Sequence, residues 1–165
     1  AGAAQADGDQ LLFLHADTWL PEPFSAWLSQ LQTLQINKTR RWGRFDVALS
    51  GSYWMFRVIE RAINVRSRLT GIATGDQALF VSRELFQQLG GFAEIPLMED
   101  VELCRRLRRM SAPLCIKQRV KTSSRRWEQG GIVRTILLMW ELRLRFFLGA
   151  SPTELAARYS PFRSS

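Results

Sequence analysis

The sequence predicts an α/β fold in which a sheet is flanked by helices and followed by a helical C-terminal extension. Short apolar segments of strand length alternate along the chain with longer segments of helical periodicity. The 165 residues, 46% of them hydrophobic and 23% charged, are sufficient for one domain with a buried core. No repeat, low-complexity run or long apolar span interrupts this pattern. We therefore expect a single domain over 1–165, with 131–165 as its helical tail.

Five short segments have strand character, because they are apolar runs or alternate apolar with polar residues. The first, residues 11–14, is apolar throughout, so we expect it to be buried on both faces. The remaining four expected strands are 45–49, 78–81, 114–116 and 120–122.

The helices are predicted from apolar residues three or four apart and from residues that favour helix ends. Residues 1–6 are typical of a helix end, and Pro21 opens a helix that extends to residue 34. Ser52 is expected to cap the next helix, which Gly71 ends. The other helices are expected at 82–89, 98–110 and 132–148 and from 151 onward.

Charge is distributed unevenly along the chain, whose formal net charge is +8. Residues 1–100 carry 9 basic and 11 acidic side chains, whereas 101–165 carry 14 basic and 4 acidic ones. The basic part predicts an anionic partner such as a phosphate, a nucleic acid or a membrane surface. Two cysteines and one histidine exclude a disulfide scaffold and a Cys/His zinc site, and they indicate a reducing, cytoplasmic setting.

Polar residues follow the first expected strand, where α/β sheets commonly bind ligands. His15 and Asp17 are two residues apart, a spacing that directs both side chains to the same side of an extended chain. An imidazole and a carboxylate can bind a divalent cation, and that cation can hold a diphosphate. The alternative is structural, with Asp17 as a turn residue and His15 as a half-buried polar side chain.

Two adjacent acids, Glu99 and Asp100, stand near the start of the helix expected at 98–110. Gly90, Gly91 and Pro96 precede them and constrain the chain, so a carboxylate can be directed into a cleft. In that position it can act as a general base on a hydroxyl. The alternative is a stabilising interaction with the helix dipole.

The segment Gly75-Asp76-Gln77 precedes the strand expected at 78–81. Glycine permits close backbone approach, and Asp and Gln can hydrogen-bond a polyol. A plain turn is the alternative.

Arg126 and Trp127, preceded by Arg125, follow the last expected strand. Guanidinium groups suit phosphate oxygens, and an indole offers a stacking face. The alternative is a solvated basic surface.

The helix expected at 132–148 is amphipathic, and three of its four charges are positive. An aromatic and basic helix of this kind suits a membrane interface. Packing on the sheet of the same domain or on a second subunit is the alternative. Its apolar stripe is expected to consist of Ile132, Ile136, Met139, Trp140, Leu144 and Phe147.

In their order and approximate spacing, three segments resemble the family 2 glycosyltransferases, inverting enzymes with the GT-A fold. They are LLFLHADTWLP, GDQALFVSRELFQQLGGFAEIPLMEDVELCRRLRR and TSSRRWEQGG. The likeness covers nearly the whole chain and is greatest to a bacterial branch associated with radical-SAM and selenium-linked clusters and labelled arsenosugar biosynthesis. It implies a Rossmann-like sheet, a nucleotide-sugar donor, an acceptor hydroxyl, and Mn²⁺ or Mg²⁺ as cofactor.

The resemblance also implies roles for individual residues. His15-Ala16-Asp17 stands where the family has its D-x-D element, which binds the metal and the donor diphosphate. Because the first acid is replaced by histidine, metal binding rests mainly on Asp17. The pair Glu99-Asp100 matches the family's E-D element, in which Asp100 would deprotonate the acceptor.

The two other segments match elements that contact substrate. By the resemblance, Gly75-Asp76-Gln77 lines the pocket for the donor sugar and the acceptor. Arg126-Trp127 is similar to the end of the Q-x-x-R-W element of processive members. Ser123 stands in place of the glutamine, so processive synthesis is not expected.

Members of the family carry an N-terminal part that holds the nucleobase and ribose, and this sequence contains no counterpart. The resemblance therefore implies that 1–165 is the C-terminal portion of a GT-A domain and that the isolated chain is a poor enzyme. A cytoplasmic location is expected, and two associations stay open: peripheral contact with the inner face of the membrane through 132–148, and a homodimer.

A second class of function stays open at this point. The chain would then be a non-catalytic α/β module that binds an anionic partner, a nucleic acid or a membrane surface. No stacking-aromatic pattern typical of nucleic-acid binding supports it, so nucleic acid is not the expected partner. The contact residues would be Arg125, Arg126, Arg134, Arg143 and Arg145.

Overall fold

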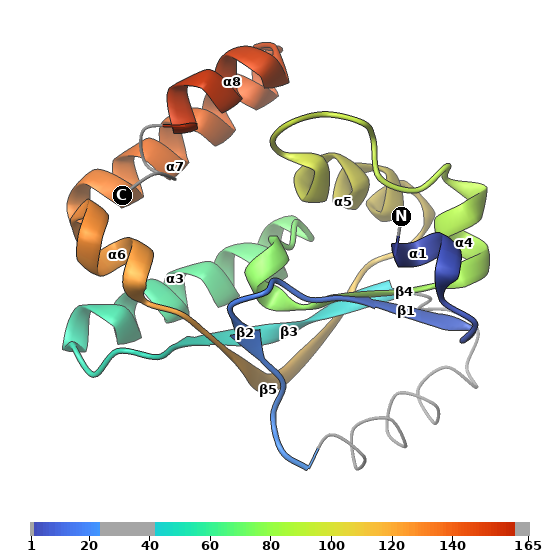
Figure 1. The fold of residues 1–165 in the computed structure, drawn as a ribbon, viewed down its shortest axis with the longest axis horizontal. Helices are drawn as coiled ribbons and strands as arrows, with labels where there is room; N and C mark the ends of the chain where they lie inside the picture. Colours follow the sequence, from blue (N-terminus) through green and yellow to red (C-terminus); the bar gives the residue numbers. More distant parts are fainter. Residues whose placement is uncertain (1, 24–41, 161–165) are drawn as a thin grey trace.

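The computed structural model describes residues 2–23 and 42–160, and it confirms a mixed α/β fold (Figure 1). Five strands form one sheet in the order β1-β4-β3-β5-β2. The central strand β3 is antiparallel to β4 and parallel to β5, while β1 and β2 are antiparallel edge strands. The strands are β1 (Gln10–Phe13), β2 (Thr18–Trp19), β3 (Trp42–Leu49), β4 (Leu79–Ser82) and β5 (Leu114–Thr122).

Two predictions for the strands are wrong. The segment 11–14 is not buried on both faces, because β1 is an edge strand in which Leu11 is buried and the following Leu14 is exposed. The strands expected at 114–116 and 120–122 are one strand, β5. Its pairing with β3 shifts register between Phe45 and Asp46, so that the polar residues 117–118 of β5 are extra residues between its two apolar ends.

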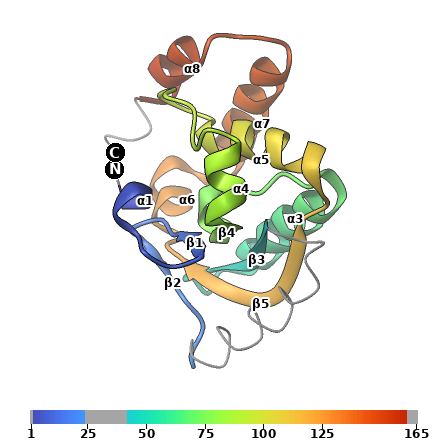
Figure 2. The ribbon, with the colours of Figure 1, turned by 90° about the vertical axis from the view of Figure 1, so that its right-hand side faces the viewer.

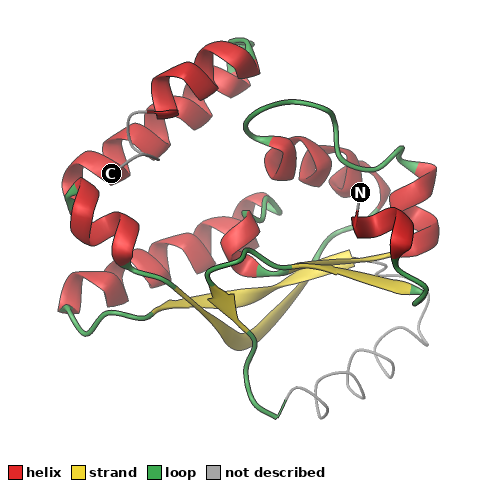
Figure 3. Cartoon of the chain, viewed as in Figure 1, coloured by secondary structure: helices red, strands yellow, loops and turns green. Residues whose placement is uncertain are grey.

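The helices of the described residues agree with most of the expected ones, and Figure 3 shows how they are distributed around the sheet. Ser82 caps α4 by accepting a hydrogen bond from Leu85 N–H at 3.3 Å, and Gly71 ends α3 at a φ of 65°. Ser52 does not cap α3, which begins after Tyr53 without a side-chain cap. Most of the helix expected at 21–34 lies outside the described residues. The elements are α1 (Gly2–Gln5), α3 (Trp54–Thr70), the 3-10 turn η1 (Gly75–Gln77), α4 (Arg83–Gln88), α5 (Glu99–Met110), α6 (Arg125–Gly130), α7 (Ile132–Phe147) and α8 (Pro152–Tyr159).

Apolar side chains are buried on both faces of the sheet, because neighbouring residues of a strand point to opposite faces. Leu79 and Val81 of β4 contribute to the larger cluster, which also contains Leu107 of α5 and Leu142 of α7. Phe80, between them, belongs to a second cluster around Phe45, whose ring lies 5.9 Å from that of Phe80. In Figures 1 and 2, α5, α7 and α8 lie on the same side of the sheet.

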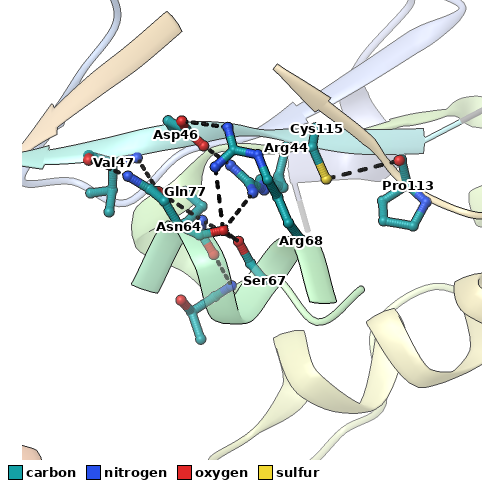
Figure 4. Close-up of polar contacts among 10 residues, drawn as sticks. Arg44, Asp46, Val47, Asn64, Ser67, Arg68, Gln77, Pro113 and Cys115 are labelled. Atoms are coloured by element: carbon teal, nitrogen blue, oxygen red, sulfur yellow. Dashed lines mark hydrogen bonds and ion pairs between the residues drawn. The ribbon is translucent and has the colours of Figure 1, made fainter. Parts of the chain in front are cut away.

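Side chains of α3 complete the hydrogen bonding of β3 beyond Arg44, the last residue of β3 that pairs with β4. β4 pairs with β3 only at residues 42–44, so the backbone groups that follow need other partners. Asn64 supplies them at Val47, donating to its carbonyl at 3.0 Å and accepting from its N–H at 2.9 Å (Figure 4). Glu60 accepts from Leu49 N–H at 2.6 Å. These bonds hold α3 along the edge of β3.

The buried Arg44 side chain joins the same network. It pairs with Asp46 and donates to the Asn64 carbonyl at 3.1 Å, while Arg68 donates to the other Asp46 oxygen at 2.6 Å (Figure 4). The buried charge is therefore paired with a carboxylate, and two of its three nitrogens are hydrogen-bonded, while Nε has no partner among the described residues.

Helix α7 has two apolar faces instead of the single stripe expected from the sequence. Leu138 and Leu142 are buried, and Met139 packs partly on the same core. We call the opposite side the outer face of α7; its residues are Val133, Leu137, Trp140, Leu144 and Phe147, all more than half exposed. The stripe is thus divided, since Ile132 and Ile136 pack near α3 while Trp140, Leu144 and Phe147 lie on the outer face. None of the described helices is long and apolar enough to cross a membrane.

Candidate functional site

The candidate site forms where the end of β1 meets the start of β4. Because the two strands are antiparallel, with Phe13 opposite Leu79, the residues after β1 lie beside those before β4. His15 therefore packs against η1. A Cβ on Gly75 would lie only 2.0 Å from His15 Nε2, so a glycine is required for the imidazole to occupy this position.

The segment from His15 to Thr18 is a turn, in which Thr18 N–H donates to the His15 carbonyl at 3.1 Å. The expectation that His15 and Asp17 share one side of an extended chain is therefore wrong. The turn carries the chain from β1 to β2, at opposite edges of the sheet. Its far end is fixed to β5 by Ser123 N–H, which donates to the Asp17 carbonyl at 3.1 Å. The half-buried Asp17 side chain thus lies near the carboxyl end of β5.

Two residue types that can bind a divalent cation, His15 and Asp17, stand in this turn. No cluster of three or more possible metal ligands exists among residues 2–23 and 42–160. Mg²⁺, however, is commonly held by one or two carboxylates and by substrate phosphates. Asp17 offers one such carboxylate.

Asp100, at the start of α5, also contacts η1, the segment against which His15 packs. Its Oδ2 accepts from Gly75 N–H at 2.8 Å and its Oδ1 from Val101 N–H at 2.7 Å. Burial raises the pKa of the Asp100 carboxyl above its usual range. The negative charges of Glu99 and Asp76 raise this pKa further, while the two hydrogen bonds oppose the shift. The structure therefore brings three predicted segments together: His15, Gly75-Asp76 and Glu99-Asp100.

Gln77 is fully buried and holds η1 in place. Its Nε2 donates to Ser67 Oγ at 3.0 Å and to Asn64 Oδ1 at 3.4 Å, and its Oε1 accepts from Thr74 N–H at 3.4 Å. The amide that was expected to bind substrate is thus occupied by α3 and the backbone. By contrast, Asp76 Oδ1 is buried without a hydrogen-bond partner among the described residues.

Two arginines that the sequence did not single out as a pair complete the cluster. Arg66 of α3 donates to Thr74 Oγ1 at 3.4 Å, next to η1. Burial lowers the pKa of Arg66 to about 10, and the positive charge of Arg143 of α7 contributes to this decrease. Asp76 and Asp100 interact favourably with both guanidinium groups. Arg66 is one of several arginines on α3, so spacing alone could not distinguish it.

Arg126 and Trp127 lie in α6, apart from this cluster. The exposed Arg126 guanidinium lies 5.7 Å from the centre of the Tyr159 ring. Trp127 packs on the cluster of Leu49, Phe56 and Ile59 and lines a pocket of about 290 Å³. Across the described chain, no hydrogen bond, ion pair or ring contact connects either residue to Asp100.

The chain was also compared with known proteins. No family model, no curated protein and no solved structure matches it.

Proposed function

We propose that this chain belongs to an inverting, metal-assisted sugar transferase of the family 2 type with a GT-A fold. One observation supports this most strongly: three segments that the resemblance connects with donor and acceptor meet at Asp100. Its carboxylate bonds to Gly75, which in turn packs against His15. The cluster lies at the end of the sheet where α/β proteins commonly bind ligands.

The proposed reaction is a direct displacement at the anomeric carbon of a nucleotide-sugar. Asp100 accepts the proton of an acceptor hydroxyl, and the oxygen forms a bond to the anomeric carbon. The bond from that carbon to the diphosphate oxygen breaks, and its electron pair leaves with the nucleoside diphosphate. Because attack and departure occur on opposite faces, the configuration is inverted. A carboxylate with a raised pKa is a better proton acceptor than an ordinary one.

Two further groups have defined roles in this proposal. A Mn²⁺ or Mg²⁺ bound by Asp17 and His15 would neutralise charge on the departing diphosphate. Asp76 has one buried carboxylate oxygen without a partner in the described part of the chain, so this residue of η1 is available to bind a sugar hydroxyl. Gln77 positions Asp76 without contacting the substrate.

The test is release of nucleoside diphosphate from a panel of nucleotide-sugars by the native gene product. We expect Asp100→Asn to reduce turnover by at least about 100-fold, the usual range for loss of a general base, with donor binding retained. Glu94→Gln is the matched control, because Glu94 is an exposed acid in the preceding loop. Turnover by Asp100→Asn within about tenfold of the unmodified protein would contradict the assignment.

A further inference from the structure

The strongest feature without a role in the preceding sections is the pair of arginines beside Asp100. Arg66 Nε and Nη1 are both buried and find no hydrogen-bond acceptor among the described residues. Leaving charged donors buried without partners is costly, so proteins rarely retain them without a reason. The third nitrogen, Nη2, has one hydrogen bond within residues 2–23 and 42–160, the long one to Thr74 Oγ1.

Neither arginine has an ion-pair partner among the carboxylates that the structure describes. Within the described part of the chain, the ion pairs of 4.0 Å or less include no member from Arg66 or Arg143. Asp76 and Asp100 are close enough to interact electrostatically with both guanidinium groups, but they do not satisfy their donors. The bonds that the Asp100 oxygens accept come from the backbone N–H groups of Gly75 and Val101 and not from either arginine.

The surroundings show that these groups converge from separate parts of the chain. Arg66 belongs to α3, Arg143 to α7, Asp76 to η1 and Asp100 to α5. Cys104, one turn after Asp100, interacts with both Asp100 and Arg66, and burial raises the pKa of its thiol to about 12. Burial lowers the pKa of Arg66, and the positive charge of Arg143 lowers it further, so the two guanidinium groups are near enough to interact electrostatically.

We propose that Arg66 and Arg143 form a binding subsite for an oxyanion of a substrate, a phosphate group, beside the Asp100 carboxylate. Planar guanidinium groups with free N–H donors are suited to phosphate oxygens, to which they can bind through two parallel hydrogen bonds. A phosphate would accept from the open donors of Arg66 and relieve its repulsion with Arg143. This inference rests on the proposed function in naming a substrate as the source of the phosphate.

The first test measures binding without turnover. Inorganic phosphate and pyrophosphate are titrated calorimetrically, with chloride at equal ionic strength as reference. We expect Arg66→Gln and Arg143→Gln each to weaken binding by at least about tenfold, the loss expected for charge-assisted hydrogen bonds. Arg61→Gln on α3 and Arg145→Gln on α7 are the controls, because both side chains are exposed. Equal affinities in all five proteins, or no binding by the unmodified protein, would overturn the proposal.

Arg66→Lys distinguishes a loss of binding from a folding defect, because it keeps the positive charge but removes the planar guanidinium group. It should bind phosphate more weakly and have the same free energy of unfolding as the parent protein. The second test identifies the source of the phosphate in the native gene product. A raised KM for the nucleotide-sugar in Arg143→Gln would assign the subsite to the donor diphosphate, whereas a raised KM for the acceptor would assign it to an acceptor phosphate. If neither changes, the substrate assignment is wrong. Phosphate binding without any sugar transfer would retain the subsite and contradict the proposed function instead.

Discussion

Replacing Asn64 by alanine should weaken the fold strongly, because one side chain completes the edge of the central strand. The Asn64 amide is the partner of both backbone groups of Val47, which is fully buried. Each backbone group left buried without a partner costs about 1–3 kcal/mol, so the two together cost about 2–6 kcal/mol. Asn64 also accepts from Gln77, whose other bond to Ser67 remains. Because water can enter part of the space that the amide leaves and bond to these groups, we expect a loss of about 3 kcal/mol.

The assay is equilibrium unfolding in urea, followed by tryptophan fluorescence and far-UV circular dichroism. Arg61→Ala is the matched control, because Arg61 lies on the exposed side of the same helix and should change the free energy of unfolding by less than about 0.5 kcal/mol. A loss below about 1 kcal/mol for Asn64→Ala would refute the conclusion that α3 completes the hydrogen bonding of β3.

Three further predictions concern the site and α7. Folding raises the pKa of the Asp100 carboxyl, so the parent protein loses stability as pH rises from about 4 through the raised pKa, and Asp100→Asn should not show this loss. Urea unfolding of both proteins at several pH values measures the difference in their free energies of unfolding. A difference that does not change with pH would contradict the prediction. Gly75→Ala should displace the imidazole of His15, the single histidine, and so change its NMR signal. Gly8→Ala is the control and should leave that signal unchanged. An unaltered signal in Gly75→Ala would show that the imidazole does not pack against Gly75. If α7 contacts membranes as expected from the sequence, Trp140→Asp on its outer face should reduce co-sedimentation with anionic liposomes. Lys117→Ala on β5 is the control, because it lowers the net charge by the same one unit at an exposed position. Absence of co-sedimentation for the parent protein would contradict the expected membrane contact.

Much of the fold could be predicted because local patterns decide where elements begin and end. Ser82 before α4 and Gly71 after α3 have the positions expected of helix caps, and the buried residues of α5 follow the helical period. The order and direction of strands could not be predicted, because they depend on pairing between distant segments. Thus β1, although apolar enough for a central strand, lies at an edge.

The candidate site could be predicted in part, because some of its residues stand in local sequence patterns. Asp100 and Gly75 stand in segments with recognisable patterns, and the structure joins them by a hydrogen bond. Arg66 and Arg143 gain their significance only from burial and from each other, and neither property has a local signal. Gln77 shows the opposite case, since a residue type suited to substrate is used to fix a loop.

The central claim is that the site performs direct displacement at an anomeric carbon. The most direct measurement is the configuration of the first product formed by the native gene product from an α-linked nucleotide-sugar, followed by proton NMR before the sugar can equilibrate. The proposed reaction predicts a β-linked product, with Asp100→Asn forming it at least about 100-fold more slowly. An α-linked product, or a β-linked product formed equally fast without the Asp100 carboxylate, would contradict it.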